Sequence, residues 1–421
     1  MIQPRLLWSR SSAALLLALA CPAQGHPELI AREGLPLPGS TLVATHLSPP
    51  FHDAAGVIGF AGTATNGATA SGFAFVHPSV VWAGSVSSPV PHIAAARATN
   101  GFFQTVAGAP PVWAVRGELA GAPTVVLQTS GGTLLRTGDP VPGFSFGVVE
   151  GIDPSPRVTT DGSLYFVVDT SIAGGTTILY RVTGSSAAAF HPVLVGGSTV
   201  DGIALKRNFH NGFYPFQVAD NGAHFISMVA YRDYASDRRA IYKDGVVVAR
   251  YGTPIVGVVG LAGQFLATYS NTAVDDQGNW LASAETNLGV EVLLRNGTPV
   301  VREGQVLDGV YLAPQGGPRS VRLAASGEAA FVWYSTVGAR NADHLFYAPD
   351  VTSVGAAQRV FTAPGPVDFT GDGIADATVL SLGPAGYPPE VAIERGWIHC
   401  RVRLRLADGS TPVALVRFPL P

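Results

Sequence analysis

The chain has 421 residues, of which 47% are apolar and 13% are charged, so it can bury a large core and does not have the composition of a disordered protein. The formal net charge of −3 argues against a nucleic-acid partner, because nucleic-acid-binding proteins carry a basic face. The 50 glycines and 32 prolines follow no collagen period, so they indicate many turns.

The N-terminus has the features of a signal peptide. Arg5 and Arg10 precede the apolar run Ala13–Ala20, which is too short to span a bilayer. We therefore predict that residues 1–25 are a signal peptide and that the mature protein is secreted or periplasmic. Cys21 directly follows Ala20, so a lipoprotein is the alternative. No later stretch is long and apolar enough to predict a membrane span.

An apolar strand that runs into a glycine turn recurs along the chain. Its six turn glycines are separated by 50, 54, 59, 55 and 52 residues. A constant period of this size is typical of a β-propeller with one four-stranded sheet per repeat. The six segments are Leu29–Gly34, Val80–Gly84, Leu134–Gly138, Val193–Gly197, Val247–Gly252 and Val300–Gly304.

A second glycine turn inside each period introduces another strand. The glycine allows a positive φ angle, and a neighbouring Asp or Asn caps the turn. A hairpin follows, most clearly at Asp244-Gly245 and Asn296-Gly297. Each repeat thus holds about four strands, which predicts an all-β propeller of six to seven four-stranded blades. The copies of the turn are Asp53–Phe60, Ala98–Phe103, Thr159–Phe166, Ala219–Ile226, Asp275–Ala282 and Ala324–Phe331.

The two ends of the chain are predicted to meet. Residues 26–363 contain the repeats, and residues 364–421 form either a divergent last blade or a small separate β unit, such as a sandwich. Because an open ring would expose sheet edges, we expect Glu28–Arg32 to pair with C-terminal strands and to close the propeller.

Two repeat segments carry a family resemblance. Ser326–Phe331 has a Gly-x-x-Ala-Phe pattern, and Leu135–Gly143 has an Arg-x-Gly turn followed by prolines. Together they resemble the secreted bacterial tandem Asn-x-x-Gly-x-x-Ala-Phe repeat proteins, also called choice-of-anchor repeat proteins, over roughly residues 28–365. The family's leading asparagine is replaced here, for example by Ala324. The resemblance implies an exported, propeller-like protein without an assigned activity or catalytic residues.

The segment Asp368–Asp376 has the spacing of a calcium loop. Oxygen-bearing side chains stand at relative positions 1, 3, 5 and 9, and glycine stands at position 6. The pattern resembles integrin-type and dockerin-type loops, which implies a structural Ca²⁺, although no glutamate stands at position 12. The alternative is a polar Asx turn between two strands. The candidate ligands are Asp368, Thr370, Asp372, Asp376 and the carbonyl oxygen of Ile374.

The candidate binding surface lies in one repeat. Residues 231–239 form its most polar and aromatic-rich stretch, and a second aromatic stretch, residues 208–214, precedes it. Exposed tyrosine and arginine on the loops of a rigid scaffold are typical of recognition sites, whereas the alternative is a solvated hairpin loop. The candidate ligand-binding residues are His210, Tyr231, Arg232, Tyr234, Arg238 and Arg239.

Three functions fit these observations. A monomeric, non-enzymatic propeller that binds a glycan, a protein or a cell-surface component at a loop face agrees best with regular repeats and one variable polar loop. A propeller hydrolase or lyase is the first alternative, and it would need carboxylates or histidines that converge at the axis. A purely structural envelope protein is the second alternative.

Overall fold

A computed structural model describes most of the chain. The described residues are 25–48, 50–52, 58–67, 70–76, 79–83, 93–94, 101–104, 112–119, 124–129, 131–153, 156–183, 189–208, 216–233, 236–314, 316–337, 340–383, 390–394 and 396–421. Residues 1–24 of the predicted signal peptide, with Cys21, lie outside this part. Within it, no helix has both the length and the apolar character needed to cross a bilayer.

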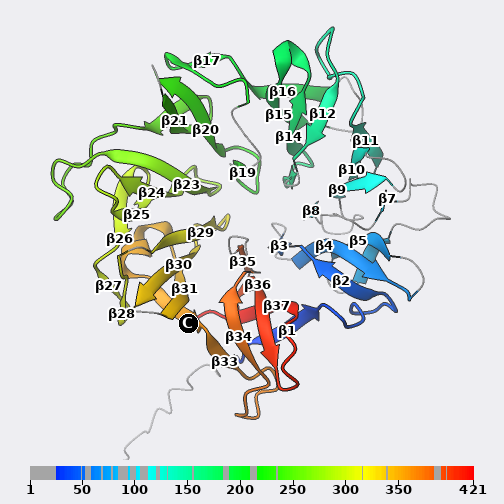
Figure 1. Cartoon of the computed structure of the whole chain (residues 1–421), viewed down its shortest axis with the longest axis vertical. Helices are drawn as coiled ribbons and strands as arrows, with labels where there is room; N and C mark the ends of the chain where they lie inside the picture. Colours follow the sequence, from blue (N-terminus) through cyan, green and yellow to red (C-terminus); the bar gives the residue numbers. More distant parts are fainter. Residues whose placement is uncertain are drawn as a thin grey trace, which may run out of the picture.

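The described strands form seven small antiparallel sheets arranged in a ring, which is a seven-bladed β-propeller (Figure 1). The predicted all-β propeller is therefore confirmed, and the blade count is seven. From the inner to the outer edge, blade 1 contains β2 (Val43–Leu47) with β3 (Phe51–His52), β4 (Ile58–Thr65), β5 (Ala70–Val76) and β6 (Ser79–Ala83), and blade 2 contains β7 (Ile93–Ala94) with β8 (Gly101–Gln104), β9 (Val112–Leu119), β10 (Val125–Thr129) and β11 (Gly132–Arg136). Blade 3 contains β12 (Val149–Ile152) with β13 (Arg157–Val158), β14 (Leu164–Thr170), β15 (Thr176–Val182) and β16 (Phe190–Val195); blade 4 contains β19 (Phe216–Val218), β20 (Phe225–Asp233), β21 (Ser236–Lys243) and β22 (Val246–Arg250); and blade 5 contains β23 (Leu266–Val274), β24 (Trp280–Thr286), β25 (Glu291–Arg295) and β26 (Thr298–Arg302). Blade 6 contains β29 (Gly317–Leu323), β30 (Ala329–Val337), β31 (Arg340–Ala348) and β32 (Gln358–Ala363), and blade 7 contains β34 (Ala377–Leu382) with β35 (Val391–Glu394), β36 (Trp397–Leu406), β37 (Val413–Pro419) and β1 (Glu28–Arg32).

Short elements complete the ring. The strand β33 (Gly365–Val367) pairs with β34, and a single pair between β5 and β7, Ser71 opposite Ala94, joins the first two blades into one ten-stranded sheet. Two-stranded hairpins lie in the connections before blades 4 and 6, and two 3₁₀ turns lie within the part of the chain that the structure describes. These elements are β17 (Thr199–Val200) with β18 (Ile203–Ala204), β27 (Val306–Leu307) with β28 (Val310–Tyr311), η2 (Ile172–Gly174) and η4 (Val351–Ala356).

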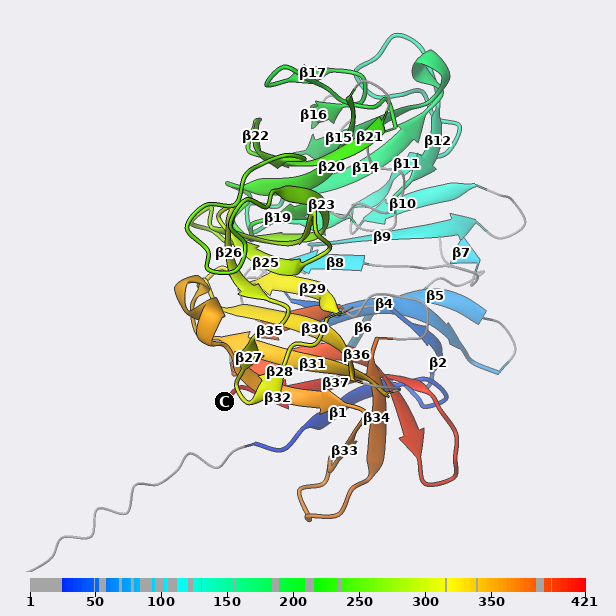
Figure 2. The ribbon, with the colours of Figure 1, turned by 60° about the vertical axis from the view of Figure 1, so that its left-hand side comes forward.

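The ring closes through both ends of the chain, as predicted. The strand β1 runs antiparallel to β37, with Glu28 opposite Arg417 and Arg32 opposite Ala414, and the two lie side by side in Figure 2. Glu28 and Arg417 also form an ion pair. The described C-terminal strands β33 to β37 and the strand β1 therefore share one sheet of the ring, so they form a blade and not a separate sandwich.

Four of the six predicted inner glycine turns lie within the described residues and are present, whereas residues 98–100 of the second copy lie outside them. Gly162, Gly222, Gly278 and Gly327 have φ angles of 76°, 73°, 79° and 91°, which other residues rarely adopt. At the hairpin turn, Asp244 and Gly245 have φ angles of 49° and 97°, which matches a two-residue turn with two positive φ angles. Gly56, in the first copy of the turn, lies outside the described residues.

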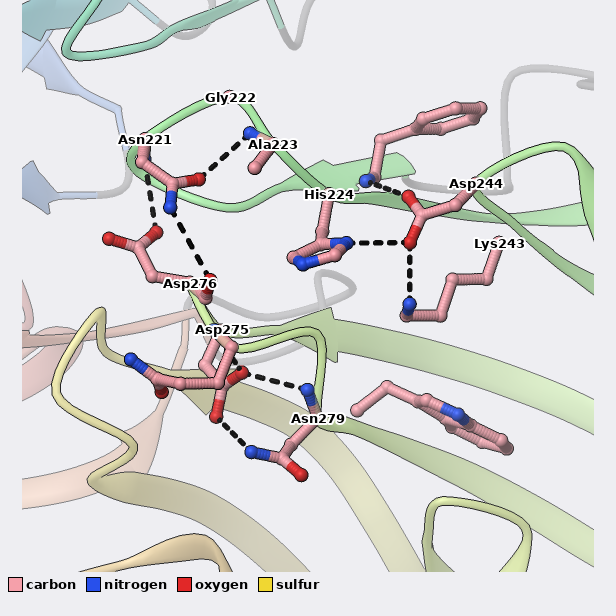
Figure 3. A network of polar contacts seen from close by, with 12 residues as sticks. Asn221, Gly222, Ala223, His224, Lys243, Asp244, Asp275, Asp276 and Asn279 are labelled. Carbon is pink, nitrogen blue, oxygen red and sulfur yellow. Dashed lines mark hydrogen bonds and ion pairs between the residues drawn. The ribbon is translucent and has the colours of Figure 1, made fainter.

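Turns of neighbouring blades are hydrogen-bonded to each other. The Thr160 amide donates to the Asp220 carbonyl oxygen at 2.7 Å, which links blades 3 and 4. The Asn221 amide donates to Asp276 Oδ1 at 3.0 Å, which links blades 4 and 5 (Figure 3). Gln277 Nε2 donates to the Ala325 carbonyl oxygen at 3.2 Å, which links blades 5 and 6. These contacts hold consecutive inner strands in the same register around the axis.

The core consists of apolar layers between adjacent blades, since both faces of each sheet pack against a neighbour. Phe331 and Trp333 lie between blades 5 and 6, and Phe60 and Leu415 lie at the closing seam between blades 7 and 1; each is at most 1% exposed. The outer edges are also covered in part. Asp201 Oδ2 accepts the Val247 amide proton of β22 at 2.6 Å, and this blunts an edge strand that would otherwise offer free backbone groups.

Candidate functional site

The structure describes half of the predicted binding residues in full. His210 and Tyr234 lie outside the described residues, and Arg232 lies in β20 with a side chain outside that description. Tyr231 of β20 lies directly opposite Arg238 of β21, so both side chains share one face of blade 4. Arg239 belongs to the other face, and its Nη1 donates to the Tyr269 carbonyl oxygen of blade 5 at 2.8 Å.

Tyr231 lines a groove at the outer part of blade 4. The groove has a volume of about 550 Å³ and lies between the β17–β18 connection and the turn that follows β22. A neighbouring hollow of about 360 Å³ shares Ile203, Arg250 and Thr253 with it. The groove is lined by Gly202, Ile203, Ala204, Tyr231, Arg250, Tyr251, Gly252, Thr253 and Pro254.

The aromatic side chain that the sequence analysis missed is Tyr251. The Arg238 guanidinium stacks over its ring at 3.5 Å from the centroid, and Phe265 packs against it edge-on at 5.4 Å. Such a cation–π contact holds the half-buried ring in one orientation. Arg238 therefore positions Tyr251, and Tyr251 in turn lines the groove.

Hydrogen bonds fix the backbone beneath the groove. The Arg250 amide donates to Thr253 Oγ1 at 3.0 Å, and the Tyr269 hydroxyl donates to the Arg250 carbonyl oxygen at 2.9 Å. Burial raises the pKa of Tyr269, so this phenol stays a neutral donor. With its backbone held, Arg250 is an exposed residue that lines the groove together with the two tyrosines.

A signal for Tyr251 was present in the repeat alignment. The residue before the turn glycine is Glu33, Ala83, Thr137, Gly196, Tyr251 and Glu303 in the six copies. Tyr251 is the single aromatic residue in that set. Arginine precedes this position in four copies, so Arg250 alone would not have stood out. The signal is visible only when the six copies are compared position by position, because each copy alone indicates no more than a turn.

The predicted calcium loop is closed by its own backbone. Asp368 accepts amide protons from Thr370, Gly371 and Gly373 at 3.0, 2.7 and 2.6 Å. Asp376 accepts the Phe369 amide proton at 2.7 Å. In the described part of the chain, no group of three or more His, Cys, Asp or Glu side chains gathers in a way that could hold a metal ion. The arrangement is that of Asx turns, the alternative named for this segment. Calcium binding stays a prediction.

No family model and no curated protein matches the sequence. Solved propellers resemble the fold distantly. Trypanosoma rangeli sialidase in complex with the inhibitor DANA is 12% identical, with a TM-score of 0.35, over 93% of this chain and 58% of that chain. The neuraminidase-like protein from A/bat/Guatemala/164/2009 is 9% identical, with a TM-score of 0.34, over 94% and 96%. An α-L-arabinofuranosidase of Fusarium graminearum is 8% identical, with a TM-score of 0.37, over 76% and 92%. Likeness at this level carries no argument about activity.

Proposed function

We propose that this protein is a saccharide-binding β-propeller whose ligand lies in the groove formed by Tyr231, Arg250 and Tyr251. The observation that carries the proposal is the fixed Tyr251 ring beside an exposed arginine in the groove at the outer part of blade 4. Tyrosine offers an apolar face together with a hydroxyl, and arginine offers several donors, which is the combination that a sugar ring with its hydroxyl groups requires.

The size of the groove favours a small ligand over a protein surface. Small-molecule sites typically enclose about 300–1,000 Å³, whereas a stable protein partner needs roughly 800 Å² on each side. A volume of about 550 Å³ is in the first range. A role in binding extracellular material agrees with export and with membership of the tandem repeat family that Ser326–Phe331 resembles. Both belong to the same proposal.

The proposal is tested on the mature chain with an array of neutral and acidic oligosaccharides, followed by calorimetry on the ligands that bind. Tyr251→Ala removes the ring and is expected to weaken binding by about tenfold or more, or about 1.4 kcal/mol. Tyr251→Phe keeps the ring stacked on Arg238 but removes the hydroxyl group, so it measures how much the hydroxyl contributes to binding. Tyr311→Ala, at a tyrosine that is 51% exposed in β28, is the matched control and should bind as the wild type does.

Three outcomes would overturn the proposal. Binding of no oligosaccharide by the folded wild type would favour the structural envelope protein. Binding that Tyr251→Ala leaves unchanged would move the site elsewhere, and turnover of a bound oligosaccharide would favour the hydrolase or lyase.

A further inference from the structure

A polar cavity lies between blades 6 and 7, far along the chain from the groove at Tyr251. It has a volume of about 280 Å³. Strands β29 to β32 of blade 6 line one side, and β34 of blade 7 lines the other; the two blades are neighbours in Figure 1. The polar side chains in its lining are Arg319, Tyr334, Asn341, Asp343 and Ser381.

The strand register places two of these side chains on the face toward blade 7. Tyr334 of β30 lies directly opposite Asp343 of β31, and side chains two residues apart on a strand share a face. Val332 and Leu345, two residues away on that face, are 0% exposed and belong to the apolar layer between blades 6 and 7. Asp343 therefore places a carboxylate at the end of an apolar layer.

An irregularity in β29 brings Arg319 to the same cavity. Pro318 and Ser320 each face a residue of β30, but the register shifts between them, so Arg319 is the extra residue of a bulge. Bulges redirect side chains and are common beside functional sites. The Arg319 guanidinium lies over the Tyr334 ring, 3.5 Å from its centroid. Because Arg319 is an exposed residue, it lies where the cavity opens to solvent.

The Asp343 carboxylate is buried and only half satisfied. The residue is 7% exposed, and its Oδ2 accepts the Leu382 amide proton of blade 7 at 3.0 Å. Within the described residues, the buried Oδ1 has no hydrogen-bond partner. Burial raises the pKa of Asp343, and the Leu382 amide and Arg319 oppose this rise without cancelling it. A buried acceptor of this kind is costly to leave without a donor.

Other blades show that the scaffold does not require such a group. Seven residues after the turn glycine, blade 3 has Asp169, blade 4 has Val229 and blade 6 has Tyr334. Val229 is 0% exposed and continues the apolar core. Asp169 Oδ1 accepts the hydroxyl proton of Thr177, which lies directly opposite, at 2.7 Å. Blade 6 also has an acid in its pair, but no residue in the described part of the chain supplies the donor to Asp343 Oδ1.

The charges around the cavity select the chemistry of its ligand. Asp343 opposes an anion and Arg319 opposes a cation, so a neutral ligand is favoured. Adjacent hydroxyl groups can donate to a carboxylate and accept from a guanidinium at the same time. The χ2 torsion of aspartate is soft, which lets the carboxylate turn toward a donor. A volume of about 280 Å³ lies at the lower end of small-molecule sites, roughly 300–1,000 Å³, so the ligand has the size of one sugar ring.

We propose that the cavity between blades 6 and 7 is a second saccharide site, in which adjacent hydroxyl groups of a neutral sugar unit pair with Asp343 and Arg319. The choice of a sugar rests on the proposed saccharide-binding function, whereas the location is independent of the groove at Tyr251. The two sites share one feature, an arginine guanidinium 3.5 Å from the centroid of a tyrosine ring. Here the buried carboxylate adds a charged acceptor.

The test titrates the Tyr251→Ala protein, which lacks the ring of the other groove, with glucose, galactose and mannose. Calorimetry and saturation-transfer NMR follow binding at millimolar sugar. Acetamide, a small neutral amide without hydroxyl groups, is the comparison ligand. The expected result is saturable binding of at least one sugar, with acetamide at least about tenfold weaker.

Three variants in the Tyr251→Ala background locate the site. Asp343→Asn keeps an acceptor for the Leu382 amide but loses the charge, and it should weaken sugar binding by about tenfold or more. Arg319→Gln should also weaken it by about tenfold. Arg359→Gln, at an exposed arginine of β32 in the same blade, is the matched control and should change nothing. Circular dichroism checks each fold, and the exposed Arg319 decides the question if Asp343→Asn does not fold.

Failure of this site and failure of the proposed function give different results. If oligosaccharides bind the wild type but no sugar binds Tyr251→Ala, the second site is wrong and the groove at Tyr251 stands. If sugars bind but Asp343→Asn and Arg319→Gln leave their affinity unchanged, the location is wrong. If acetamide binds as tightly as the sugars, the preference for hydroxyl groups is wrong. If nothing binds and Asp343→Asn only lowers the melting temperature, both proposals fail and Asp343 is a structural cap for β34.

Discussion

Truncation of Leu415 tests whether the two ends of the chain lock the ring. Leu415 lies on β37 opposite Ala31 of β1, it is 1% exposed, and it packs in the layer that also contains Phe60 of blade 1. Leu415→Ala removes three buried carbons, which is about 2.4 kcal/mol at about 0.8 kcal/mol for each. The cavity left behind brings the expected loss in unfolding free energy to about 3 kcal/mol.

Urea unfolding of the mature chain, followed by circular dichroism and tryptophan fluorescence, measures this loss. Leu293→Ala is the matched variant, because Leu293 is 0% exposed between blades 5 and 6, away from the seam. Leu288→Ala, at a side chain that is 70% exposed, should cost close to nothing. If the ring is closed as tightly as it is packed elsewhere, Leu415→Ala and Leu293→Ala should cost similar amounts. A loss below about 0.5 kcal/mol for Leu415→Ala, with a normal loss for Leu293→Ala, would refute a packed seam.

Three further perturbations address the turns, the loop and a buried acid. In urea unfolding, Gly278→Ala should destabilise the protein by more than Gly263→Ala. Both glycines have positive φ angles, but a Cβ at residue 278 would lie 3.0 Å from the His224 ring, whereas a Cβ at residue 263 would meet nothing within 4 Å. Equal losses would show that crowding at the turn is unimportant. Excess Ca²⁺ should raise the melting temperature of the mature chain and chelator should lower it if Asp368–Asp376 binds the ion, whereas no shift in either direction removes the calcium prediction. Burial, and then Glu285 and Glu303, raise the pKa of Glu291 to about 7. The folded state therefore holds the proton more tightly than the unfolded state, and stability present below about pH 4.5 is lost as the pH rises through about 7. Glu291→Gln should flatten that part of the stability profile, and an unchanged profile would contradict the assignment.

The fold could be predicted because its signals are local. A positive-φ glycine beside a capping Asp or Asn sets a turn within a few residues, and an apolar strand before a glycine turn marks the outer edge of six blades. The seventh outer strand, β32, escaped because it ends in Ala363-Pro364 and lacks that turn. The blade count therefore stayed open in the sequence, while the pairing of Glu28–Arg32 with the C-terminal strands followed from the need to cover an edge.

The candidate sites depend on contacts that no local pattern contains. Tyr231 and Arg238 were predicted because they lie in one polar hairpin. Tyr251 was not, because it lies in the turn after β22 and contacts Arg238 of β21 only in the folded blade. Contacts between inner strands are harder still, since Gln217 and Arg322 are 105 residues apart in the chain and meet only when the blades are arranged in a ring. Sequence periodicity predicts that blades exist; it does not predict which side chains face each other across the axis.

The repeat register nevertheless shows which residues lie at equivalent positions on the inner strands of blades 3 to 6. Turn positions are constrained by backbone geometry in blades 3 to 6, as the positive φ angles of Gly162, Gly222, Gly278 and Gly327 require. The position five residues earlier has no such constraint, and its occupants differ in size and charge, from Arg157 and Gln217 to Ala273 and Arg322. The ring therefore fixes the turn glycine in these blades and leaves the residue type at this inner-strand position free. The hydrogen bond from Arg322 to Gln217 across the intervening blade is the direct evidence that these positions converge.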